Sequence, residues 1–237
     1  GQLLAYWRGA RAGVGFTPSG VLWGAPRSRL TLEWAAQKFT VNSIQSQVNP
    51  KFLTLFQGDG FAPVGGLGFT TLTVANGIVT SSRDEAFTPA PGEITLTFDP
   101  STQPKLGAAL PGDAATVSLT SSDAAWVNVT DAIGAGPRLV KDGLYAVDAK
   151  LEGFDTTKEI WRATRQVAFG VDARSWYVIA MFELGTPEEF ARALVGAGLR
   201  DALRMDSGSS AQVALMGGLI AGKWARTVPN ALAFVPR

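Results

Sequence analysis

Turn-forming residues divide most of this chain into short segments, and their spacing is the strongest constraint on its fold. The 237 residues include 27 glycines and 13 prolines, and only 17% are charged. Short apolar or alternating segments lie between the turn residues, as at 12–16, 21–24, 30–34 and 52–56. This spacing is typical of a β-rich protein rather than of a helical bundle.

The clearest local element is a β-hairpin over residues 68–82. Threonines alternate with apolar residues there, and Asn76-Gly77 provides the residue types that favour a type I′ turn. Further strands are expected over 92–99 and 114–122. Residues 131–145 are expected to be turns around an apolar pair.

The best-defined unit is a strand–helix–strand segment over 176–206. The apolar run 176–182, which Trp176 opens, is typical of a strand buried on both faces, and 200–206 predicts a second strand. Two strands joined in this way are expected to be parallel, with a right-handed crossover. We therefore predict an α+β fold, a β-rich single domain over 1–237 with a mixed sheet and a C-terminal βαβ unit.

The helix between these strands carries start and stop signals. Thr186 is a natural N-cap, Pro187 fits the first helical position, Glu189 completes a capping box, and Gly198 can end the helix. The predicted apolar face consists of Phe190, Ala193, Leu194 and Ala197.

Composition excludes several classes of chemistry. The chain has no histidine and no cysteine, so acid–base catalysis must use Asp, Glu, Lys or Tyr. The formal net charge is +1 and no block of like charge stands out, so no nucleic-acid partner is expected. We expect no metal, no cofactor and no transmembrane segment. A nucleotide loop at Gly134-Ala135-Gly136 is disfavoured, because the third glycine of the dinucleotide motif is missing.

Two carboxylates follow the two strands of the βαβ unit. Glu183 comes just after the first strand, and Asp206 comes just after the second. The carboxyl ends of parallel strands share one edge of a sheet, where α/β folds bind ligands. The sequence therefore predicts that these two side chains converge. The alternative is a purely structural role, in which Asp206 bonds to its own turn and Glu183 is a solvated strand end.

Four segments resemble, in the same order, motifs of the phosphodiester glycosidase family. They are GAGPRLVKDG (134–143), RQVAFGVD (165–172), LGTPEEFARALVGAGLRDALRMDSGSS (184–210) and RTVPNALAF (226–234). The resemblance implies a mixed α+β fold and hydrolysis of a sugar-1-phosphodiester of the N-acetylglucosamine type.

For the site, the resemblance implies a catalytic carboxyl pair beside an anion-binding loop. Asp206 and Glu183 are the carboxyl candidates. The substrate phosphate is expected to be bound by the loop and by a nearby charge; the candidates are Gly208, Ser209, Ser210, Arg165 and Arg226.

The chain departs from the family pattern at several of these positions. Its Asp206–Ser210 loop is one residue shorter than the family's Asp-Gly-Gly-Gly-Ser-Ser. Gln166 stands where the family has Arg, and Arg165 is shifted by one, which in a strand points it to the opposite face. Glu183-Leu184 stands where the family has Asp-Gly, after the first strand of the βαβ unit. An early Asn-Gly-x-Phe-Phe motif is absent, so the domain is expected to lack its N-terminal segment.

Two hypotheses follow from this comparison. The first is an exported phosphodiester glycosidase that acts on envelope glycans, with a glycan or sugar-phosphate ligand and envelope proteins as partners. The second is a non-catalytic cell-envelope binding or structural module that retains the fold. The altered motifs leave the enzymatic activity open.

Overall fold

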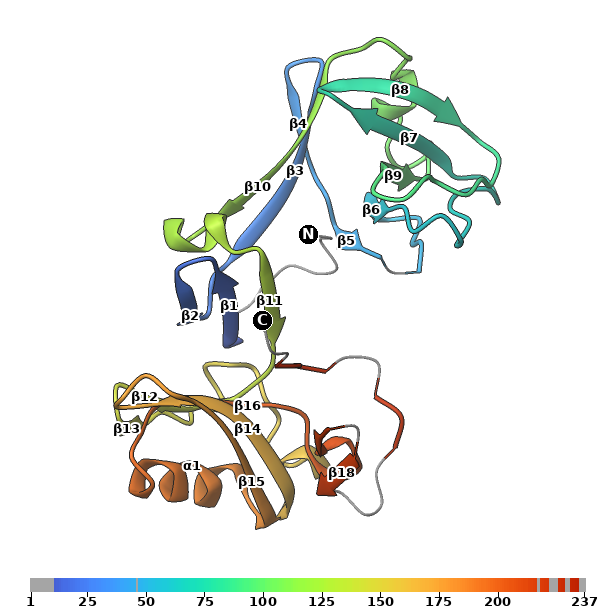
Figure 1. The fold of residues 1–237 in the computed structure, drawn as a ribbon. Helices are drawn as coiled ribbons and strands as arrows, with labels where there is room; N and C mark the ends of the chain where they lie inside the picture. The colour runs from blue at the N-terminus through green and yellow to red at the C-terminus, as the bar shows by residue number, and fades with distance from the viewer. Residues whose placement is uncertain (1–10, 46, 217, 222–225, 229–230, 235–237) are drawn as a thin grey trace. The chain divides into compact units, whose positions relative to one another are not determined.

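The computed structural model describes residues 11–45, 47–216, 218–221, 226–228 and 231–234. The chain divides into two compact units (Figure 1). Arg27–Asn128 form the first unit, and the second contains the described residues up to Pro26 and those from Val129 onward. The expectation of one domain over 1–237 stays a prediction.

Two β-sheets enclose the core of the first unit. Its elements are β3 (Ser28–Trp34), β4 (Gln37–Thr40), β5 (Ser43–Ile44), β6 (Thr54–Gln57), β7 (Thr70–Ala75), β8 (Ile78–Arg83), β9 (Ile94–Phe98), β10 (Ala115–Ser121) and the 3₁₀ turns Leu106–Ala108 and Ala124–Asn128. The sheets have the orders β5-β6-β9-β7-β8 and β10-β3-β4. In the larger sheet β5 and β6 are parallel and the other neighbours are antiparallel, so this sheet is mixed, as predicted.

Local signals in the first unit predict its elements well. The hairpin of β7 and β8 turns at Asn76 and Gly77, whose φ angles of 52° and 78° are the positive values that a type I′ turn requires. Leu32, Leu96 and Phe98 are fully buried between the two sheets. Apolar residues of both sheets therefore form one core.

The second unit contains a five-stranded sheet with one α-helix among its described residues. Its elements are β1 (Gly13–Thr17), β2 (Gly20–Gly24), β11 (Asp131–Gly134), β12 (Arg138–Lys141), β13 (Leu144–Tyr145), η3 (Glu159–Trp161), β14 (Thr164–Asp172), β15 (Tyr177–Gly185), α1 (Pro187–Gly196), β16 (Leu199–Arg204), η4 (Gly208–Ser210), β17 (Val213–Leu215) and β18 (Gly218–Ala221). The main sheet has the order β13-β12-β16-β14-β15, and α1 lies on one of its faces (Figure 1). Side chains from the small sheet β11-β1-β2 pack against the other face, around Phe169 and Leu203.

The strand–helix–strand segment has the predicted order, but its strands are not neighbours. Both β15 and β16 pair antiparallel with β14, so they run parallel to each other with β14 between them. β14 comes from the segment 165–172, to which the sequence analysis assigned no strand. Residues 131–145, expected to be turns, also contain the short strands β11, β12 and β13.

The expectation that β15 is buried on both faces is wrong. β15 has a partner strand only on its β14 side among the described residues, and it lies at the edge of the sheet. Trp176, expected to open a buried strand, is 64% exposed, and Tyr177 is 51% exposed. The apolar run alone does not show whether a strand is central or at an edge.

Helix α1 begins and ends as predicted. Thr186 accepts a hydrogen bond from the Glu189 backbone, and the Glu189 side chain accepts one from the Thr186 backbone, which completes the capping box. Gly198 follows in the left-handed region, at φ +81°. The buried face contains Phe190 and Leu194 as predicted, but Ala193 and Ala197 are exposed and Ala191 is buried instead.

Replacing Thr186 by Ala should lower the free energy of unfolding by about 1 kcal/mol, because the Glu189 backbone N–H loses its acceptor. Thr156→Ala, at an exposed turn position, is the matched control. Urea denaturation followed by circular dichroism measures both changes. Equal effects of the two variants would show that the cap does not stabilise α1.

Candidate active site

The loop after β16 lies beside the start of β14. β14 and β16 are antiparallel neighbours, so the end of one strand meets the beginning of the other. Gly208, in η4, has φ +62°, a backbone conformation that glycine adopts more readily than other residues. A Cβ atom at Gly208 would lie 3.6 Å from the Thr164 hydroxyl oxygen. The sequence therefore folds residues 206–210 into a tight loop against β14.

Four of the predicted site residues meet at this loop. Arg226 donates from Nη2 to Oδ2 of Asp206 at 3.4 Å and from Nε to Oγ of Ser210 at 2.7 Å. The Arg226 backbone N–H also donates to the Ser209 carbonyl at 3.1 Å. The side chains of Asp206 and Arg226 are 58% and 64% exposed. An exposed ion pair of this kind adds little stability, but its carboxylate and guanidinium are accessible to a ligand.

Glu183 and Arg165 form a separate pair. Nε of Arg165 lies 3.4 Å from Oε2 of Glu183, whose side chain is 74% exposed. The neighbouring Phe182 packs on α1, where its ring stacks on Phe190 at a centroid distance of 5.6 Å. Since side chains alternate along a strand, Glu183 points away from the α1 face. The structure therefore does not give Glu183 and Asp206 a common partner.

A buried arginine that the sequence analysis did not single out lies beneath the loop. Arg204, at the end of β16, is 1% exposed. Its Nε donates to Oε1 of Gln166 and its Nη2 donates to the Ile160 carbonyl, both at 2.6 Å. The amide of Gln166, also fully buried, donates to the Gly185 carbonyl at 2.8 Å. One guanidinium thus connects β16, β14 and η3, and Gln166 extends this network to β15.

Burial dominates the electrostatics of this arginine. Desolvation lowers the pKa of Arg204 to about 10, and the charges of Asp206 and Glu188 act in the opposite direction. No ion pair joins Arg204 to a carboxylate of a described residue. A buried cation bonded only to neutral acceptors is costly, and such groups are enriched at functional sites. The sequence feature that could have indicated this buried residue is an arginine within the otherwise apolar segment 202–205.

Glu188 provides a further carboxylate near Arg204. It lies in the first turn of α1, and its Oε1 accepts a hydrogen bond from Nε1 of Trp161 at 2.6 Å. Trp161 is buried and follows Ile160, the residue whose carbonyl binds Arg204. The side chain of Glu188 is only partly buried.

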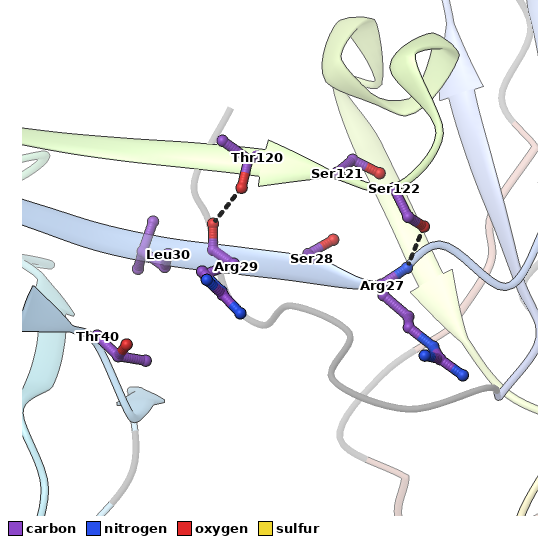
Figure 2. A pocket seen from close by; sticks show the side chains of 8 residues that line it. All are labelled: Arg27, Ser28, Arg29, Leu30, Thr40, Thr120, Ser121 and Ser122. Atoms are coloured by element: carbon purple, nitrogen blue, oxygen red, sulfur yellow. Dashed lines mark hydrogen bonds between the residues drawn. The ribbon is translucent and has the colours of Figure 1, made fainter.

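A hollow of about 570 Å³ lies in the first unit (Figure 2). The described residues that line it are Arg27, Ser28, Arg29, Leu30, Thr40, Thr120, Ser121 and Ser122. Oγ of Ser122 accepts from the Arg27 backbone at 2.9 Å, which joins the two strands beside the hollow. This lining has guanidinium and hydroxyl groups but no carboxylate, so it offers anion contacts without an acid or base.

Two further features bear on the class of site. No group of three or more Asp and Glu side chains in the described part of the chain could hold a metal ion. None of the described helices has the length and apolar character needed to cross a membrane.

In the segment 226–234, which resembles the last family motif, Pro229 and Asn230 lie outside the described residues.

Comparison with known proteins identifies the class as a glycosidase-like domain. The family model described as phosphodiester glycosidase matches residues 68–235, which is more than two thirds of the chain and includes the Asp206 loop. The chain therefore belongs to the phosphodiester glycosidase family. No curated protein matches it.

Two solved structures with a similar fold are bacterial proteins. A hypothetical protein from Synechocystis has a TM-score of 0.75 and 19% identity over 94% of this chain and 46% of that chain. The second is a Burkholderia pseudomallei protein that is provisionally named as an exported protein. It has a TM-score of 0.68 and 19% identity over 92% of this chain and 55% of that chain. This chain thus spans about half the length of each of them.

The zebrafish N-acetylglucosamine-1-phosphodiester alpha-N-acetylglucosaminidase catalytic domain also matches. Its TM-score is 0.32, with 12% identity over 92% of this chain and 78% of that chain. A similarity of this size does not establish a common fold.

Gln166→Leu should lower the free energy of unfolding by about 2–3 kcal/mol, because the Arg204 guanidinium and the Gly185 carbonyl both lose a buried partner. Gln166→Glu also loses the donor to the Gly185 carbonyl, but it keeps an acceptor for Arg204 and should cost less at neutral pH because the carboxylate pairs with the guanidinium. Denaturant unfolding of both variants tests this order. Equal losses would show that the bond to Arg204 contributes nothing.

Proposed function

We propose that this protein hydrolyses the glycosidic bond of a sugar-1-phosphodiester, with its centre at the loop after β16. The observation that carries the proposal is the accessible cluster of Asp206, Ser210 and Arg226, which joins a carboxyl group to two anion-binding groups. The class of reaction is proposed from the phosphodiester glycosidase family, whose match to this chain includes the loop.

The chemistry of the substrate fits this set of groups. A glycosidase needs a carboxyl group at the scissile bond, usually as one of a pair. A phosphate leaving group carries negative charge, which a guanidinium and a hydroxyl can stabilise by charge-assisted hydrogen bonds. Once the substrate phosphate binds Arg226 in place of Asp206, the released carboxyl group would take up a proton and donate it to the leaving oxygen, while Arg226 and Ser210 would bind the phosphate. The Gly208 and Ser209 segment shapes the loop that presents them.

Substrate and location are further parts of the proposal. The sugar is of the N-acetylglucosamine type and the substrate an envelope glycan, as the family resemblance implies. Export is supported by the name of the Burkholderia relative. Envelope proteins are the expected protein partners.

A non-catalytic envelope module is the alternative function. The observation that favours it is Gln166, which stands where the family pattern has an arginine and is bonded to buried groups rather than to a ligand. The short Asp206–Ser210 loop and the Glu183-Leu184 pair are further departures. Such a module would bind a glycan without releasing sugar from it.

Wild-type protein should release free N-acetylglucosamine from N-acetylglucosamine 1-(methyl phosphate), and Asp206→Asn should lower kcat at least about 100-fold, because the proton donor is lost. The control is Asp172→Asn, since Asp172 also pairs with an exposed arginine, Arg174, but at the opposite end of β14. Sugar release is measured by chromatography. If the wild type and Asp206→Asn were equally inactive, the enzymatic proposal would fail and the binding module would be favoured.

Arg226→Met should raise the KM for the same substrate about tenfold or more, because the phosphate loses a charge-assisted hydrogen bond. Arg174→Met removes a similarly exposed arginine away from the loop and should leave KM unchanged. Steady-state kinetics distinguish the two. An unchanged KM in Arg226→Met would remove Arg226 from the phosphate site.

A further inference from the structure

Two adjacent glutamates at the start of α1 have different partners. Glu189 is used by the helix itself, because its carboxylate accepts from the Thr186 backbone at 2.8 Å. Glu188 points elsewhere, and Oε1 accepts from the buried indole N–H of Trp161. Its second oxygen, Oε2, has no hydrogen-bond partner among the described residues. The carboxylate of Glu188 is therefore held at one oxygen and available at the other.

Glu188 and Asp206 lie on the same side of the sheet, on either side of Arg204. Met205 continues the β-ladder by donating to the Val167 carbonyl and packs on the face opposite α1. Asp206 therefore follows on the α1 face, like Arg204. Arg204 bonds to Ile160, and the next residue, Trp161, bonds to Glu188. This short chain of contacts links Glu188 to the buried guanidinium, and the charges of Glu188 and Asp206 both act on it.

We infer that Glu188, and not Glu183, is the second carboxyl group of the site, where it acts as the base on the attacking water. This inference rests on the hydrolase function proposed above. Glu183 is bound to Arg165 and points away from the face on which Asp206 lies. In Glu188 the indole donor and the amino end of α1 both stabilise the negative charge that a base must carry. Arg204 is a positioning residue, because its burial keeps it from direct contact with a substrate.

The reaction balances with these two carboxyl groups. The water oxygen attacks the anomeric carbon, and the bond from that carbon to the phosphate oxygen breaks. The electron pair of that bond stays on the phosphate oxygen, to which Asp206 gives its proton. Glu188 takes the proton of the attacking water. The products are the free sugar and a phosphomonoester, and solvent exchange returns both carboxyl groups to their starting states.

The test compares Glu188→Gln with Glu183→Gln on N-acetylglucosamine 1-(methyl phosphate). Gln at 188 keeps an oxygen that can accept from Trp161, so the fold should persist, which a melting curve checks. We expect kcat to fall at least about 100-fold in Glu188→Gln with KM nearly unchanged, and to stay within about threefold of the wild type in Glu183→Gln. Sodium formate should raise the rate of Glu188→Ala about tenfold, because formate can replace the missing base. A purely structural role of Glu188 would not allow this rescue.

The outcomes separate this inference from the function on which it rests. Turnover in the wild type that Glu188→Gln leaves intact would overturn the role of Glu188 and keep the hydrolase. Loss of activity in Glu183→Gln but not in Glu188→Gln would return the role to Glu183. Failure of formate to rescue Glu188→Ala would make Glu188 a structural residue. A wild type without turnover would remove both proposals together.

Discussion

The hydrogen bond between Arg204 and Gln166 is the interaction on which the site depends. It lies between β16 and β14, and Gln166 extends it to the Gly185 carbonyl, just before α1. Removing a guanidinium from water costs several kcal/mol. Short bonds to Gln166 and Ile160 offset part of this cost, because charge-assisted hydrogen bonds are stronger than neutral ones. The network therefore fixes the ends of several elements at the edge of the sheet where the loop begins.

This arrangement determines which side chains can act together. The Asp206 loop begins directly after β16, and Glu188 stands in the first turn of α1. Both reach the α1 side of the sheet, whereas Glu183 turns to the other side because β15 alternates its side chains. The antiparallel strand β14 between β15 and β16 also separates the two strand ends that the βαβ prediction brought together. Neighbouring parallel strands would have been needed for that convergence.

Local signals explain which parts of this structure could be predicted from the sequence. The turn at Asn76-Gly77 and the capping box at Thr186 depend on residues close in the chain, and both were predicted. The place of β14 depends on pairing between distant segments, which no local pattern encodes. The place of Asp206 at the end of a strand indicated it as a site residue, whereas Ser210 and Arg226 were indicated by the resemblance. Arg204 was not, because arginine is rarely buried and a composition-based core excludes it.

Arg204 also bears on the alternative of a non-catalytic module, because it is the hydrogen-bond partner of Gln166. Gln166 lacks the guanidinium that the family pattern places at this point of β14. However, β14 and β16 are neighbours, and Arg204 reaches across to contact Gln166 itself. A positive charge thus lies beside Gln166, and the neighbouring strand β16 supplies it. Removing a guanidinium from water is costly, and an apolar pair could fill the same space, so packing alone does not account for Arg204. Gln166 therefore does not leave this part of the sheet without a positive charge.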